Sequence, residues 1–166
     1  MQIVNRIEEL QEKDYYVIDV FPKGIQKDNY SKIEQYFLDT YIKEYAKKVC
    51  RIVVLLHAYY DFDYYVTEFP SILSNKGRKF AKYSDRHVKH LEFKELSKLI
   101  EFVITTGVSS VEIINLKNNF LISINGDFST VVYHVFDEDK QFIESIVQRE
   151  GLYFRSIKQD KSCILE

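Results

Sequence analysis

Two carboxylates, Asp61 and Asp63, are the residues whose type and spacing most directly suggest chemistry. Side chains two positions apart on an extended segment point to the same side. The pair could therefore share a Mg²⁺ ion or act as a general acid and base, as in a small hydrolase or nucleotide-acting enzyme. Aspartate is also favoured in turns between strands, where it bonds to the local backbone. We adopt this second interpretation and assign no catalytic residue.

The histidines offer a weaker case for a metal site. His87 and His90 are three residues apart, so one helical turn could bring both imidazoles to one ion. Arg86 and Lys89 lie beside them and would repel a cation. His57 falls within an apolar run and is expected to be a hydrogen-bonded core residue. The sequence contains no Gly-rich phosphate loop and no Gly-x-Ser-x-Gly motif, and we expect neither a metal nor a cofactor.

A segment rich in tyrosine and acidic residues, 59–69, is the best candidate for a partner-binding surface. It carries three acids, six aromatic residues and no base. Tyrosine is enriched at protein interfaces, and acidic groups steer a basic partner. The alternative is that alternate aromatic residues of this segment fill the core. The residues predicted to bind a partner are Tyr59, Tyr60, Asp61, Asp63, Tyr64 and Glu68.

Positive charge is concentrated in residues 75–94, which carry seven basic and two acidic side chains. Such a segment could contact phosphates, and Phe80 and Tyr83 within it could stack on the bases of a nucleic acid. The whole chain has a net charge of −2, so a solvated loop on an acidic domain is favoured over a nucleic-acid partner. The candidate anion-binding residues are Lys76, Arg78, Lys79, Lys82 and Arg86.

Length and composition indicate one folded domain. The chain has 166 residues, of which 46% are apolar, and is expected to fold as a single unit over 1–166. Its two cysteines do not make a disulfide framework, and its N-terminus does not have the pattern of a secretory leader. The longest strictly apolar run, Ile52–Leu56, is too short to span a membrane. We predict a cytoplasmic protein with no membrane segment, a long basic loop at 70–93 and a frayed tail at 159–166, and leave its oligomeric state open.

The spacing of apolar residues predicts mixed helices and strands. A capping box at Ser31 and Glu34 opens the clearest helix, and the near-continuous apolar run Cys50–Ala58 indicates a buried strand. Gly107 is placed to end a helix, and Asn125-Gly126-Asp127 is a hairpin signal. Together these elements predict an α+β single domain: a mixed, largely antiparallel sheet with a C-terminal three-stranded meander and helices packed on one face. The other expected elements are a short N-terminal helix, strands at Tyr15–Phe21, Tyr64–Phe69, Val108–Leu116, Phe120–Ile124, Ser129–Phe136 and Tyr153–Ile157, and helices at Lys94–Thr106 and from Asp137 to Gly151.

The chain resembles the immunity proteins of bacterial polymorphic or contact-dependent toxin systems. The resemblance rests on its size, its lack of catalytic motifs and the hairpin Leu121-Ile122-Ser123-Ile124-Asn125-Gly126-Asp127, which precedes a helix and a final strand. It implies a binding protein without catalytic activity that neutralises a cognate toxin, such as a nuclease, by protein–protein contact. It assigns no individual site residue. The basic residues at 75–94 would either face away from a basic toxin or meet a toxin surface of mixed charge.

Overall fold

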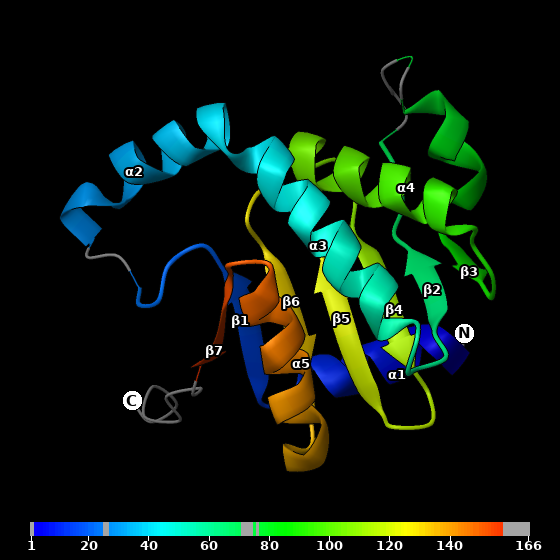
Figure 1. The fold of residues 1–166 in the computed structure, drawn as a ribbon. Helices are drawn as coiled ribbons and strands as arrows, with labels where there is room; N and C mark the ends of the chain where they lie inside the picture. Colours follow the sequence, from blue (N-terminus) through cyan, green and yellow to red (C-terminus); the bar gives the residue numbers. More distant parts are fainter. Residues whose placement is uncertain (1, 25–26, 71–74, 76, 158–166) are drawn as a thin grey trace, which may run out of the picture.

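A computed structural model describes residues 2–24, 27–70, 75 and 77–157 of the chain. A seven-stranded sheet forms its centre, and helices pack against it (Figure 1). The strands are β1 (Tyr15–Asp19), β2 (Asp63–Val66), β3 (Arg86–Val88), β4 (Val111–Asn115), β5 (Phe120–Ile124), β6 (Thr130–Tyr133) and β7 (Tyr153–Ile157). The helices are α1 (Gln2–Gln11), α2 (Lys27–Thr40), α3 (Ile42–Leu56), α4 (Phe93–Thr106) and α5 (Asp137–Arg149), with a short 3-10 helix η1 (Arg78–Tyr83).

The sheet is antiparallel throughout, with the strand order β3-β2-β4-β5-β6-β1-β7. β4, β5 and β6 form the predicted meander, and β4 and β5 are buried along their whole length. The main core lies on the face covered by α3, α4 and α5. On the other face, Ile114 and Leu121 pack with Ile7 and Leu10 of α1. The predicted α+β class is confirmed, and α1 adds a helix on the second face of the sheet.

The apolar run Cys50–Ala58 belongs mostly to helix α3, so the prediction of a strand there is wrong. The run continues an apolar stripe that starts before it, because Tyr45 and Val49 stand at helical spacing from Ile52. α3 packs along α4, and burial of this stripe outweighs the low helix propensity of consecutive β-branched residues. The buried residues of α3 are Tyr45, Ala46, Val49, Cys50, Ile52, Val53 and Leu56.

The helix predicted from Ser31 is in fact two helices. α2 already begins at Lys27, so Ser31 lies inside it and does not cap its start. Glu34 instead accepts a hydrogen bond of 2.9 Å from the hydroxyl of Tyr30. The chain changes direction at Tyr41, whose φ of −121° is not helical, and α3 follows. None of the helices in the described ranges is both long enough and apolar enough to cross a membrane.

The predicted loop at 70–93 contains regular structure, which corrects the expectation of an irregular segment. η1 and β3 both lie within it, and β3 pairs with β2 at the edge of the sheet. β2 lies between β3 and β4. A strand as short as β3 gives too few residues for alternation to reveal it. The predicted tail at 159–166 lies outside the described residues.

The end of α4 is joined to the hairpin between β5 and β6. Gly107 ends α4 as predicted, in the left-handed conformation at φ 64°. In the hairpin the left-handed residue is Asp127, at φ 60°. Gly126 has a different role: a Cβ atom there would lie 2.3 Å from the Cα atom of Gly107. The backbone N–H of Asp127 donates to the carbonyl oxygen of Ile104 at 3.0 Å, so hairpin and helix end are held in direct contact.

Candidate functional site

The acidic aromatic segment, residues 59–69, divides between the core and the surface. Phe62, Tyr64 and Phe69 are buried. Tyr64 therefore has almost no surface for a partner, and its hydroxyl is hydrogen-bonded to Nε2 of His57. Burial lowers the pKa of His57. His57 is thus hydrogen-bonded as expected, although it follows a helix and is only half-buried.

The residues that follow α3 are held against the start of α5 and the end of β4. The hydroxyl of Tyr60 donates a hydrogen bond of 2.7 Å to Oδ1 of Asp139. The backbone carbonyl of Asp61 accepts a hydrogen bond of 2.8 Å from Nδ2 of Asn115. Tyr60 is half-buried by this packing, whereas the Asp61 residue is exposed. The first part of the segment is therefore fixed in place, with the Asp61 carboxylate at the surface.

The surface around Asp61, which we call the acidic end, combines exposed apolar and acidic side chains. Figure 1 shows that the end of α3, the turn between β4 and β5 and the start of α5 gather in the lower part of the domain. Asn118 in that turn is hydrogen-bonded to Asp139, which joins the turn to α5. The acidic end consists of the exposed residues Tyr59, Asp61, Leu116, Phe136, Asp137 and Glu138.

Helix α5 contributes two acids of this surface, Asp137 and Glu138, from its first turn. Negative charge is favoured there by the helix dipole. α5 begins at Asp137, as predicted, with Phe136 at the N-cap position. Leu116, Phe136 and Asp137 were not among the site residues predicted from the sequence. The run of acids was a visible signal, but its proximity to Tyr59 depends on the packing of α5.

Asp61 and Asp63 have different surroundings: Asp61 is exposed, whereas the carboxylate of Asp63 contacts a histidine. Oδ2 of Asp63 lies 2.8 Å from Nε2 of His87 on the neighbouring strand β3. Glu68 lies beyond the end of β2 and is exposed. In the described part of the chain, no group of three or more His, Cys, Asp or Glu side chains is placed to hold a metal ion.

The candidate anion-binding residues are distributed over two elements. Lys82 forms an ion pair of 2.8 Å with Glu95, which connects η1 to α4. Lys76 lies outside the described residues. The structure does not gather the other four residues into one site: η1 carries Arg78, Lys79 and Lys82, and β3 carries Arg86.

Lys79 lines a cavity of about 510 Å³ between α3, η1 and α4, which we call the lysine pocket. Lys43 and Lys47 line it from α3, and Lys98 lines it from α4. Sequence reasoning identified only Lys79 among these lysines. The others were missed because the second half of α3 was assigned to a strand, so its packing along α4 was not foreseen.

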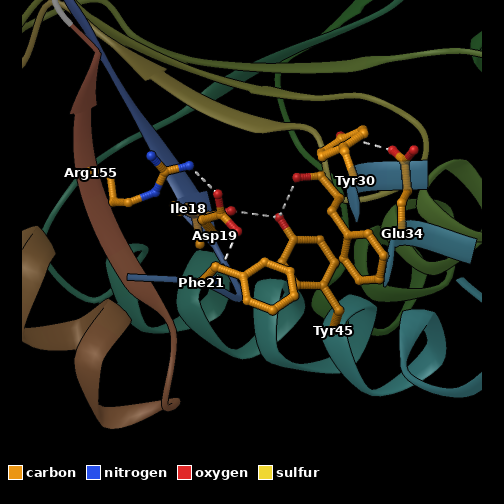
Figure 2. Close-up of polar contacts among 8 residues, drawn as sticks. Ile18, Asp19, Phe21, Tyr30, Glu34, Tyr45 and Arg155 are labelled. Atoms are coloured by element: carbon orange, nitrogen blue, oxygen red, sulfur yellow. Dashed lines mark hydrogen bonds and ion pairs between the residues drawn. The ribbon is translucent and has the colours of Figure 1, made fainter. Parts of the chain in front are cut away.

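A second cavity, of about 330 Å³, lies where α2 faces the ends of β1 and β7 (Figure 2). Arg155 of β7 forms an ion pair with Asp19 of β1. Asp19 also accepts the backbone N–H of Phe21 at 2.9 Å. Tyr30 donates to Glu34, and this hydrogen bond raises the pKa of Tyr30. Both carboxylates are thus bound by groups of the protein itself, and the ion pair of Asp19 joins β1 to the edge strand β7.

No protein-family model, no curated protein and no solved structure matches this chain, so its function has to be inferred from the surfaces themselves.

Proposed function

We propose that the chain is a binding protein without catalytic activity, an immunity protein that neutralises a cognate bacterial toxin, such as a nuclease, in the cytoplasm. The observation that carries this proposal is the acidic end. Tyr59 is 68% exposed, Leu116 52% and Phe136 48%, beside three exposed acids. Large apolar side chains that remain open to solvent at one end of a domain are typical of a surface that another protein covers.

The charge of the acidic end suits a basic toxin. A nuclease contacts phosphates and therefore presents lysine and arginine side chains. Asp61, Asp137 and Glu138 would attract such a surface and increase the association rate. Affinity would come from the apolar residues, because burying an aromatic side chain contributes about 1.5 to 3 kcal/mol. Tyr59 is suited to this role, since its ring already packs edge-on against Phe142, with the centroids 4.5 Å apart.

One basic residue, Lys117, lies at the acidic end, where it follows Leu116 and lines a cavity with Phe136. The lysines of the lysine pocket lie far from it. Lys43 and Lys47 are in the first half of α3, and Tyr59 follows its last residue. At a rise of 1.5 Å per residue, the helix separates the two surfaces by about 20 Å. Lys43 and Lys47 would therefore not oppose the approach of a basic toxin to the acidic end.

The enzymatic alternative receives less support from the structure. It requires Asp61 and Asp63 to act on one substrate or one metal ion. The carboxylate of Asp63 instead lies within hydrogen-bond distance of His87 on β3.

Co-expression of the chain with the products of its neighbouring reading frames tests the proposal. We expect one neighbour to arrest growth alone, to form a stoichiometric complex with the chain and to be harmless in its presence. Combining Asp61→Lys with Asp137→Lys is expected to weaken the complex at least about tenfold and to remove protection.

A matched control uses exposed acids on and next to α1, which covers the opposite face of the sheet. Glu8→Lys with Glu12→Lys makes the same change in net charge and is expected to leave protection intact. Equal protection by both double variants would contradict the proposed interface. Failure of the chain to protect against any neighbour would contradict the immunity function.

A further inference from the structure

The lysine pocket is a concave site in which positive charge is concentrated. Four lysines and a single acid, Glu101, line it: Lys43, Lys47, Lys79 and Lys98. None of the four lysines forms an ion pair with a carboxylate in the described ranges of the chain. Like charges that face one cavity repel one another, and a bound anion would remove this repulsion.

The floor and walls of the pocket are built from packed elements. Phe80 and Phe102 are buried beneath it, with ring centroids 5.3 Å apart. The ion pair between Lys82 and Glu95 holds η1 against α4. Nζ of Lys79 lies 4.7 Å from the centroid of the Phe80 ring, which places this ammonium group over the apolar floor. The site is therefore formed before any ligand arrives.

The geometry points to the binding of a compact polyphosphate, such as a nucleoside diphosphate or triphosphate, in the lysine pocket. Several negative charges are needed to balance four lysines and one acid, and a chain of linked phosphates carries them in a small volume. A volume of about 510 Å³ is typical of small-molecule sites. Lysine binds phosphate as a point charge and requires no Gly-rich loop, so the absence of that motif is no obstacle.

A compact ligand fits this pocket better than a nucleic-acid strand. Proteins that bind single strands use an extended basic groove with aromatic rings exposed for stacking. Here three elements bound one cavity, and Phe80 and Phe102 are 2% and 9% exposed. This inference is independent of the proposed immunity function, because the lysine pocket and the acidic end lie at opposite ends of α3.

Calorimetric titration and thermal unfolding of the full chain, with pyrophosphate and ADP as separate probes, test the inference. We expect a Kd below about 1 mM at 50 mM salt, and binding that weakens severalfold at 200 mM salt. Both probes should raise the Tm, because they bind the folded state only. Lys47→Gln with Lys98→Gln is expected to raise the Kd at least about tenfold.

The matched control is Lys89→Gln with Lys117→Gln, which removes the same charge from exposed positions outside the pocket. It is expected to change the Kd less than about twofold. The inference is overturned if neither probe gives heat or a Tm shift, or if the control weakens binding as much as the pocket variant. It is also overturned if a single-stranded oligonucleotide binds more tightly than ADP with the same dependence on Lys47 and Lys98.

Discussion

Substitution of Gly126 by alanine is expected to destabilise the domain strongly, although the residue lies in a hairpin turn. The new Cβ atom would lie 2.3 Å from Cα and 3.2 Å from the backbone nitrogen of Gly107. Both are backbone atoms, so no flexible side chain can move aside. Gly107 is itself fixed as the left-handed residue that ends α4.

The magnitude follows from the two contacts that must change. Overpacking at a tight site costs about 1 to 3 kcal/mol. Separating the hairpin from α4 also breaks the hydrogen bond from Asp127 to Ile104, which contributes about 1 kcal/mol. We therefore expect Gly126→Ala to lower the free energy of unfolding by about 2 to 4 kcal/mol. In a domain of this size that corresponds to a fall in Tm of about 5 to 15 °C.

Urea unfolding followed by circular dichroism measures this change, with Gly24→Ala as the matched control. A Cβ atom at Gly24 would meet nothing within 4 Å. The control is expected to change the free energy of unfolding by less than about 0.5 kcal/mol, at an unchanged m-value. If Gly126→Ala and Gly24→Ala have equal effects, the close approach of the hairpin to the end of α4 is refuted.

Three further predictions concern a buried carboxyl group, the ion pair between β1 and β7, and a thiol. The Oε2 atom of Glu112 is buried without a hydrogen-bond partner among the described residues. Burial raises the pKa of Glu112, so the folded state binds the proton of this carboxyl group more tightly than the unfolded state does. The free energy of unfolding therefore falls as the pH rises above the ordinary pKa of a glutamate. In urea unfolding, Glu112→Gln should raise the free energy of unfolding by about 1 kcal/mol over the parent at pH 8, but not at pH 4. Arg155→Met removes the ion pair with Asp19 and should lower the free energy of unfolding by about 1 to 3 kcal/mol. An equal loss when Asp19 is already changed to Asn would show that the ion pair is not the cause. Burial raises the pKa of Cys50 to about 12, so its thiol should be unreactive in the folded protein at pH 8. In a Cys163→Ser variant, Cys50 should react with a thiol reagent only as the protein unfolds. Reaction within seconds would contradict the packing of α3 on α4.

Local patterns were sufficient to predict elements whose determinants lie within a few residues of one another. Helix α4 with Gly107 at its end, the meander β4–β6 and the closing strand β7 follow their sequence signals closely. The run Cys50–Ala58 was assigned wrongly because a short apolar, β-branched run has the same pattern in a buried strand and a buried helix. Its contact with α4 decides between them, and that contact joins residues about 50 positions apart.

The candidate sites were predictable only in part for the same reason. Exposed Tyr59 and Asp61 were identified from composition, whereas Leu116 and Phe136 join them through the turn of the meander and the packing of α5. Tyr64 was proposed as a contact residue but faces the core, because side chains of β2 alternate between the surface and the interior. The lysine pocket combines three separate elements, and no single stretch of sequence carries its pattern.

Hydrogen exchange of the chain, alone and in complex with the toxin encoded by the neighbouring reading frame, tests the central claim most directly. We expect slower amide exchange on binding at residues 58–61, 116–119 and 136–142, which form and support the acidic end. Exchange in η1 and in the second half of α4, which border the lysine pocket, should not change. Protection centred on the lysine pocket, with the acidic end unaffected, would contradict the account.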